Sequence, residues 1–408
     1  MTRRHWVRLH RYAGLYLAFF LTVSGLTGCL MAFYHELDVW LNPQLWKVNP
    51  VGQRKDIYEL IEIAELMIPH GKVVLINLAD IADEALRLSI APKVDPATTK
   101  PYVLEVDDLF LNPYTGEKLG SRLWGNISFG RETLMTLIYR LHYELALPYN
   151  IGKWLFGIAA IIWTLDCFVG FYLTLPRGRP FWKKWLPAWQ IKTSSSLTRI
   201  NFDLHRAGGL WLWTMLLVFA WSAVYLNLGE EVYLPTMKKI FAIQNPRTAD
   251  LQEVINPVEN PTVDWHTARE IGAVLMLKCA KEQNFSIEHE EFLIYDSSHG
   301  VYRYGVKSSR DVGKHGLTTV FFNGSNGEYK ALSLPTGQYA GNTITTWLIE
   351  LHMASIWGLP YKIFVCVLGM VVTMLSVTGV VIWLRKRQAA RVKHNKITPG
   401  ENLPELNN

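Results

Sequence analysis

The sequence is poor in cysteine and in charged residues. It holds 4 Cys among 408 residues, and only 19% of its residues are charged. Three of the cysteines, Cys29, Cys167 and Cys366, lie in apolar runs. One polar cysteine cannot form an intramolecular bridge, so a disulfide-stabilised scaffold is excluded. A hydrophobic fraction of 50% also excludes disorder, collagen and a coiled coil, and no nucleophile–base constellation for hydrolysis is visible.

Four long apolar runs dominate what is present: residues 12–34, 154–175, 207–228 and 363–384. A helix that rises 1.5 Å per residue needs about 20 residues to cross a bilayer core of about 30 Å. The runs show no alternation of polar and apolar residues, which disfavours membrane strands. The sequence therefore predicts an all-α membrane bundle of four helices.

Charge is distributed unevenly between the segments that these spans separate. Residues 1–11, 176–206 and 385–408 together hold 17 Lys/Arg and 3 Asp/Glu, whereas 35–153 and 229–362 hold 24 Lys/Arg and 31 Asp/Glu. Because positive segments stay in the cytoplasm, both termini are expected inside. The expected order is a first helix within 1–34, an outer domain 35–153, helix 154–175, cytoplasmic loop 176–206, helix 207–228, outer domain 229–362, helix 363–384 and a basic cytoplasmic tail 385–408.

The first apolar run admits two other interpretations. A signal peptide has a shorter apolar region, and the run shows no small-residue cleavage pattern. Residues 26–29, Leu-Thr-Gly-Cys, resemble a lipoprotein cleavage box. Cleavage there would discard His10, so small residues that pack one helix against another are the favoured interpretation.

Short histidine motifs occur twice, in the same order. Leu-His-Arg at 9–11 and 204–206 opens spans one and three. Leu-His at 141–142 and 351–352, each followed by Leu-Pro-Tyr, precedes spans two and four by 12 and 11 residues. Proline disfavours helix at the residue before it, so Leu-Pro-Tyr is expected to fold each histidine back toward its span.

The two outer segments repeat more loosely. Residues 54–68 and 262–284 have helical apolar spacing, and strand-like runs follow at 73–78, 102–106, 301–306 and 319–322. Turn sequences at 112–116 and 323–327 close one hairpin in each segment. The chain is therefore predicted to be a parallel duplication, with two extracytoplasmic α+β domains, about an axis along the membrane normal.

Four of the 12 histidines occupy these repeated positions, and they sort into two levels. His10 and His205 lie at the cytoplasmic edge, and His142 and His352 lie on the outer side. A six-coordinate haem takes two axial ligands from facing helices, so we expect one haem near each surface. The alternatives are interfacial polar residues or a zinc site, although zinc prefers four close ligands. His35, at the outer end of span one, is a secondary candidate.

Asp166 is the only charged residue inside an apolar run. An ionisable group within a membrane is costly and suggests a function. It could handle protons or bond a cofactor, or it could be a neutral acid bonded to a neighbouring helix.

The duplicated histidine motifs and the Asn-Pro-Tyr-Thr-Gly hairpin at 112–116 resemble the PepSY-associated transmembrane family, which includes ferric-siderophore reductases of the bacterial inner membrane. The resemblance implies PepSY-like outer domains and two b-type haems, one on His10 and His205 and one on His142 and His352. The second hairpin departs from the Asn-Pro-x-x-Gly pattern, so its domain is open to a different role.

The resemblance implies electron transfer from the cytoplasmic side to a periplasmic ferric siderophore, whose iron is released on reduction to Fe(II). The cytoplasmic segments are too short for a nucleotide domain, so quinol or a separate reductase must donate electrons. Anionic lipid accounts for the basic segments without any nucleic acid. The rival functions are a siderophore or proton transporter component and a non-enzymatic PepSY module that binds an envelope partner.

Overall fold

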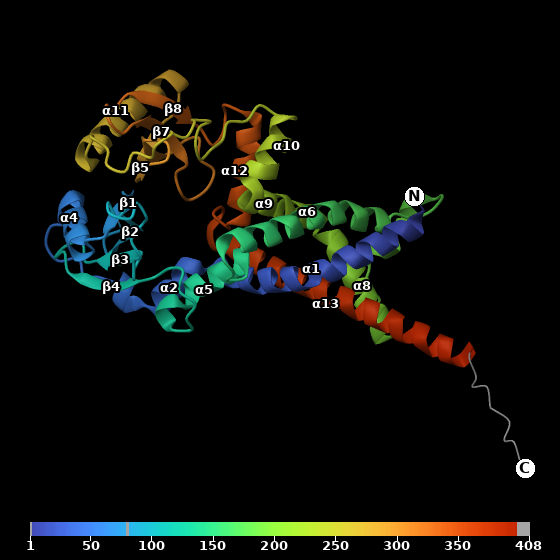
Figure 1. Ribbon diagram of the computed structural model, residues 1–408. Coiled ribbons are helices and arrows are strands. Elements are labelled where there is room, and N and C mark those ends of the chain that lie inside the picture. The colour runs from blue at the N-terminus through green and yellow to red at the C-terminus, as the bar shows by residue number, and fades with distance from the viewer. Residues whose placement is uncertain (1, 79–80, 398–408) are drawn as a thin grey trace, which may run out of the picture.

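The computed structural model describes residues 2–78 and 81–397 (Figure 1). Within that part of the chain, four helical segments are long and apolar enough to cross a membrane. They are α1 (Arg3–Met31), α6 (Tyr149–Thr174), a segment that begins with α9 (Trp213–Leu228), and α13 (Gly358–Ile397). The prediction of four membrane helices is confirmed.

The third span differs from the expected range of 207–228. The short helix α8 (Leu197–Trp211) ends just before Leu212, whose φ of −105° and ψ of 10° are not helical, and α9 begins at the next residue. Two consecutive glycines, Gly208 and Gly209, lie just before this break, and glycine weakens a helix interior. Beyond α9 the chain continues through a π-helical turn, η2 (Gly229–Tyr233), into α10 (Leu234–Lys238).

Helices α1 and α13 cross at two glycines. A Cβ atom on Gly25 would lie 2.6 Å from the carbonyl oxygen of Gly369, and one on Gly369 would lie 2.5 Å from the carbonyl oxygen of Gly25. The Cys29 thiol lies 3.0 Å from the carbonyl oxygen of Cys366 across the same contact. The small residues near the end of span one therefore pack α1 against α13.

Eight strands form one antiparallel sheet at one end of the bundle (Figure 1). Their order is β4-β3-β2-β1-β5-β6-β7-β8. The strands are β1 (Gly71–Asn77), β2 (Leu86–Pro92), β3 (Asp108–Leu111), β4 (Lys118–Arg122), β5 (Ile287–Asp296), β6 (Val301–Ser308), β7 (Thr318–Asn323) and β8 (Tyr329–Ser333). Because β1 pairs with β5, with Ile76 opposite Leu293, the strands of the two outer segments share one sheet.

Two helices cover this sheet, α4 (Ile57–Met67) and α11 (Trp265–Gln283). They lie next to each other, since the rings of Tyr58 and His266 have centroids 5.0 Å apart. Both turns predicted from sequence close hairpins, because Gly116 donates to the Asn112 carbonyl and Gly327 to the Asn323 carbonyl. The strand expected at 102–106 is wrong. Its Val103 is 96% exposed, and the next strand starts only at residue 108.

Two further helices return toward the bundle, α5 (Arg131–Glu144) and α12 (Ala340–His352). Left-handed residues follow each of them, with φ of 56° at Leu145 and 54° at Ala354, and these reverse the chain before α6 and α13 begin. Tyr361 also donates to the Leu351 carbonyl at 3.0 Å across the second turn. These reversals fold both Leu-His segments back against the bundle.

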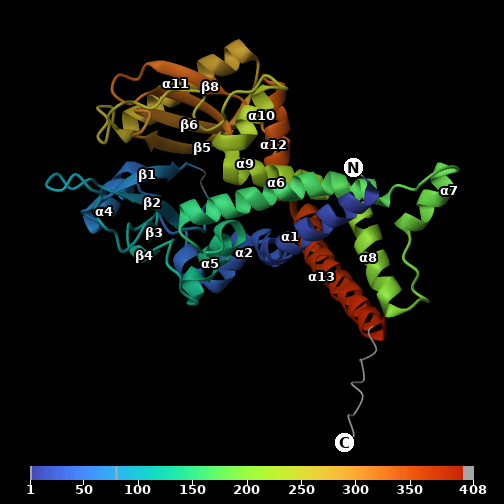
Figure 2. The same ribbon diagram turned by 45° about the vertical axis from the view of Figure 1, so that its right-hand side comes forward.

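The remaining helices are short. α2 (Tyr34–Leu41) and α3 (Pro43–Trp46) connect α1 to the sheet, where buried Arg122 pairs with Asp38 at 3.0 Å and with Asp108 at 3.1 Å. α7 (Phe181–Trp185) and η1 (Leu186–Trp189) lie between α6 and α8. Figure 2 shows α7 and α8 at the end of the bundle opposite the sheet, where the N-terminus also lies.

Candidate functional site

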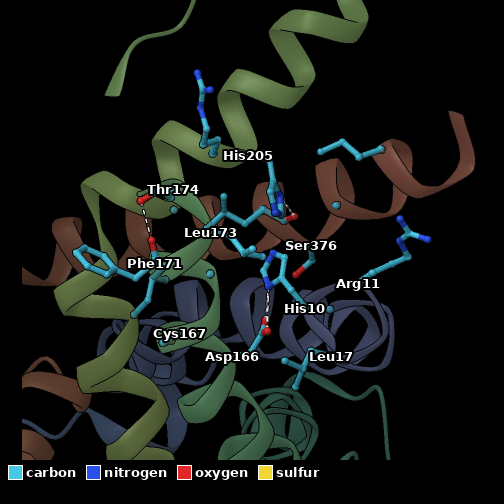
Figure 3. Close-up of a pocket in the computed structure, with 18 of the residues that line it drawn as sticks. His10, Arg11, Leu17, Asp166, Cys167, Phe171, Leu173, Thr174, His205 and Ser376 are labelled. Atoms are coloured by element: carbon cyan, nitrogen blue, oxygen red, sulfur yellow. Dashed lines mark hydrogen bonds and ion pairs between the residues drawn. The ribbon is translucent and has the colours of Figure 1, made fainter. Parts of the chain in front are cut away.

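α1 and α8 bring two of the predicted histidines together at the end of the bundle away from the sheet. The imidazole rings of His10 and His205 have centroids 6.0 Å apart, with 57° between their planes. Figure 3 shows both rings directed into one pocket. The two residues are 195 positions apart in sequence, and they form a pair because α1 and α8 both pack against α13.

Each of these rings is anchored through its Nδ1 atom. His10 Nδ1 lies 2.9 Å from both carboxylate oxygens of Asp166 on α6. His205 Nδ1 lies 3.0 Å from the Leu375 carbonyl and 3.1 Å from the Thr378 hydroxyl, both on α13. Since a hydrogen bond at one ring nitrogen fixes the role of the other, Nε2 is the atom that each ring offers to a ligand.

Glycines make room for these rings. A Cβ atom on Gly170 of α6 would lie 3.5 Å from Cε1 of His10, and one on Gly379 of α13 would lie 3.2 Å from Cε1 of His205. The Cε1 edge of each ring therefore lies close to the backbone of the helix that also supplies its hydrogen-bond acceptor. This contact fixes the ring position as well as its rotation.

The inner cavity, as we call the pocket between these two histidines, has a volume of about 450 Å³. Its walls are mainly apolar, and cationic side chains of Arg3, Arg11, Arg206 and Lys386 also line it. Pockets for cofactors commonly have volumes of about 300–1,000 Å³ with apolar walls and a few polar groups. The inner cavity fits that description.

A second pair lies nearer the sheet. His142 on α5 and His352 on α12 have ring centroids 6.4 Å apart, with 75° between their planes. His142 Nδ1 lies 3.0 Å from the Thr27 hydroxyl of α1, and His352 Nδ1 lies 2.6 Å from the Ser222 hydroxyl of α9. Phe219 stacks on His352 with centroids 4.8 Å apart. The anchoring again leaves Nε2 of both rings for a ligand.

The outer cavity, between His142 and His352, has a volume of about 390 Å³. Three residues, Leu21, Trp163 and Val372, line both cavities and therefore form the wall between them. Lys153 and Arg247 are cations that line the outer cavity. The two cavities thus follow one another along the bundle.

The spacing within each pair suits a shared metal ion. Two imidazoles that bind one metal ion from opposite sides, each at a metal–nitrogen distance of about 2 Å, place their ring centroids about 6 Å apart. The observed separations are 6.0 Å and 6.4 Å. Each pair therefore has a ring separation at which its two imidazoles could hold one metal ion.

The protonation states of the buried histidines agree with this use. Burial lowers the pKa of His142 to about 4, that of His352 to about 3 and that of His205 to about 4. These imidazoles are neutral near pH 7, and only a neutral imidazole has a lone pair for a metal.

The two secondary candidates, His35 and Asp166, lie in different places. His35 lies outside both cavities, where its Nε2 is 3.2 Å from Glu84 and its ring packs on Trp46. His35 lies on α2, which directs it toward the sheet. Asp166 does join the site, through His10. Among the residues with described side chains, no group of three or more His, Cys, Asp or Glu could hold a metal ion.

Sequence reasoning missed the residues that anchor and seat the rings. Thr27, Ser222 and Thr378 are hydroxyl residues within apolar helices, a visible signal, but ordinary back-bonding to the helix explains such residues equally well. Gly28, whose Cβ would lie 3.1 Å from Cε1 of His142, falls in the segment that resembles a cleavage box. Its partner is 114 residues away, and the sequence alone does not indicate it.

The comparison with known families agrees with this architecture. The profile of the PepSY-associated TM region matches residues 7–386, which is most of the 408-residue chain. No curated protein matches the sequence. The matched range includes most of α1 and α13, the other two spanning helices, the sheet and both histidine pairs, and the chain therefore belongs to the PepSY-associated transmembrane family.

Proposed function

We propose that the protein is a di-haem membrane oxidoreductase that passes electrons across the bilayer to a ferric siderophore. The observation that carries the proposal is the pair of two-histidine sites, with ring separations of 6.0 Å and 6.4 Å, that open into cavities of about 450 Å³ and 390 Å³. When bound, two b-type haems supply one-electron transfer between the two sites.

The chain's own residues suit that role. His10 and His205 would hold the inner haem, and His142 and His352 the outer haem, each through Nε2. The mainly apolar walls of each cavity would face the macrocycle. Arg11 and Lys386 at the inner cavity, and Arg247 at the outer one, supply the positive charge that the carboxylates of haem attract.

The orientation follows from charge. The segments rich in Lys and Arg, of which the structure describes 2–11, 176–206 and 385–397, lie at the end of the bundle opposite the sheet (Figures 1 and 2). The positive-inside rule favours the cytoplasm for that end, so we propose that the sheet is periplasmic, and the family resemblance supports the bacterial inner membrane. Two sites in series are useful because the apolar core is about 30 Å thick.

The family resemblance supports the identity of the acceptor. Hard oxygen ligands hold Fe(III) in a siderophore, and one electron converts it to Fe(II), which those ligands hold weakly. A quinol gives up two electrons and two protons and therefore serves two ferric ions, and a cytoplasmic reductase is the alternative donor. The iron of the siderophore is the substrate and is distinct from the haem iron.

Two structural features support a duplicated origin. The strand order is symmetric about the β1–β5 pair, with β1 to β4 on one side and β5 to β8 on the other. Each cavity also takes one histidine from each half of the chain. We infer a parallel duplication whose two PepSY-like units have merged their sheets.

A transporter role is less well supported. Both oxygens of Asp166 lie 2.9 Å from His10 Nδ1, and the Asp166 side chain is 10% exposed. The one acid predicted for a proton or substrate path is thus engaged in holding a histidine.

The experiment is a reduced-minus-oxidised spectrum of the purified full chain, with haem counted per protein. The wild type is expected to show b-type bands and about two haems per chain. His205→Ala and His352→Ala should each lose one haem. His35→Ala is the matched control, because His35 lies outside both cavities, and it should retain two. A wild type without haem overturns the proposal and favours the transporter or the PepSY binding module.

A further inference from the structure

One of the four histidine anchors differs in chemistry from the others. Asp166 presents a carboxylate to His10 Nδ1, with both oxygens at 2.9 Å. Among the described residues, the bonding partners of the other three rings are uncharged backbone or hydroxyl groups, on Leu375, Thr378, Thr27, Ser24 and Ser222. The carboxylate is therefore specific to the inner cavity.

The geometry of this contact is built by two helices. Asp166 and Gly170 lie one turn apart on α6, so the carboxylate meets Nδ1 while the glycine backbone supports Cε1 of the same ring. The side chains of His10 and Asp166 are 32% and 10% exposed. A hydrogen bond in such a shielded position is stronger than one in water, and Figure 3 shows it directed away from the space that His10 and His205 share.

We propose that Asp166 is a positioning residue that lowers the reduction potential of the inner haem site by making His10 a stronger electron donor. The inference rests on the proposed function. A carboxylate that accepts the Nδ1–H proton raises the basicity of the imidazole, and a more basic axial ligand favours Fe(III) over Fe(II). No anchor of the outer pair has this effect.

This asymmetry has a consequence for direction. A lower potential at the inner site, nearer the electron donor, and a higher potential at the outer site favour the outward passage of each electron. Arg11 and Arg206 at the inner cavity act in the opposite sense, although Arg206 is itself paired with Asp203 at 2.8 Å. The substitution of Asp166 alone isolates the contribution of the carboxylate, because the cations remain.

The test is a spectroelectrochemical titration of the full-length protein in the His352→Ala background, which should hold only the inner haem. Asp166→Asn is expected to raise the midpoint potential by about 59 mV or more. For one electron this shift corresponds to a tenfold change in the Fe(III)/Fe(II) ratio at a fixed potential. Thr378→Val, which removes an uncharged partner of the other axial ligand, is the matched control and should shift the midpoint by less than half as much. Equal midpoints for Asp166→Asn and its parent, with haem retained, overturn the inference.

A second measurement applies if Asp166→Asn fails to hold haem. The redox-induced infrared difference spectrum of the wild type should contain a carboxylate band that moves in Asp166→Glu, because that variant keeps a carboxylate at a changed distance. A carboxylate region that is identical in Asp166→Glu and the wild type overturns the inference. Absence of haem from the wild type would instead refute the proposed function, so the two failures are distinguishable.

Discussion

Three of the four histidine rings lie beside a glycine, and this packing leads to a graded prediction. A Cβ atom at Gly28 would lie 3.1 Å from Cε1 of His142, one at Gly379 would lie 3.2 Å from Cε1 of His205, and one at Gly170 would lie 3.5 Å from Cε1 of His10. In all three cases the new methyl group would meet a Cε1 atom of a histidine ring. Carbon atoms pack best at about 3.5–4.0 Å, so Gly28→Ala and Gly379→Ala crowd a ring and Gly170→Ala does not.

The size of the effect follows from that crowding. The His142 ring must move by about 0.5 Å to relieve the contact at Gly28, which is the tolerance of about 0.5 Å that a functional site allows. Overpacking of this kind costs about 1–3 kcal/mol, and about 1.4 kcal/mol corresponds to a tenfold change in affinity. We therefore expect Gly28→Ala to weaken haem binding at the outer site by about five- to 150-fold, Gly379→Ala to weaken the inner site somewhat less, and Gly170→Ala to have almost no effect.

The assay is the haem content per chain during competition with apomyoglobin, with each site distinguished in the His205→Ala or His352→Ala background. Gly125→Ala is the control, because a Cβ atom there would meet nothing within 4 Å. Equal haem loss from Gly28→Ala and Gly170→Ala would refute the reasoning, since the only difference worked from the structure is the space beside each ring.

Three further predictions concern anchoring and stability. Ser222→Ala leaves the Nδ1 atom of His352 buried without its hydroxyl partner. An orphaned polar group costs about 1–3 kcal/mol, so haem should dissociate from the outer site at least fivefold faster in the same competition assay. Arg122→Met leaves two buried carboxylates without their shared cation and should cost about 3–5 kcal/mol in chemical unfolding, whereas Lys55→Met, at an exposed pair, should cost less than about 1 kcal/mol. The Arg269 guanidinium lowers the pKa of the Glu290 carboxyl. The ion pair therefore stabilises the fold fully above the unfolded pKa of about 4.3, and this stabilisation is lost as the pH falls below that value. Glu290→Gln should reduce the loss of stability at acid pH, and an unchanged acid dependence would contradict the assignment.

Much of the membrane part could be predicted from the sequence, because long apolar runs and repeated short motifs are local signals. The four spans appeared in the structure near their expected positions, with the third one shifted by the break at Leu212. The expected reversal between each Leu-His motif and its span is present, with left-handed residues at Leu145 and Ala354. The role expected for Leu-Pro-Tyr holds only in the first copy, where α6 begins at Tyr149. In the second copy α13 already begins at Gly358, so that Leu-Pro-Tyr lies in the first turn of the helix, where proline is tolerated, and the chain reverses before it.

The union of the two outer segments could not be predicted in the same way. Pairing of β1 with β5 joins residues more than 200 positions apart, and no local pattern encodes which strand edges meet. The same limit applies to Asp166. Its cost in a membrane marked it as functional, but its bond to His10 depends on the rotation of α6 against α1, which packing decides. His35 shows the converse, because nearness in sequence suggested a ligand that the fold directs elsewhere.

The pattern of anchoring explains why the halves of the chain must be joined so firmly. His10 is anchored by α6 and His142 by α1, so the first half orients its own two rings. The second half does the same, since α13 anchors His205 and α9 anchors His352. Each cavity nevertheless takes one ring from each half, so neither half alone contains a complete pair. The separation of 6.0 Å or 6.4 Å within a pair is therefore set by the contacts between halves. Those contacts are the packing of α1 on α13 with its glycine crossing, the packing of α6 on α9, and the pairing of β1 with β5. A displacement of one half against the other would therefore change both separations.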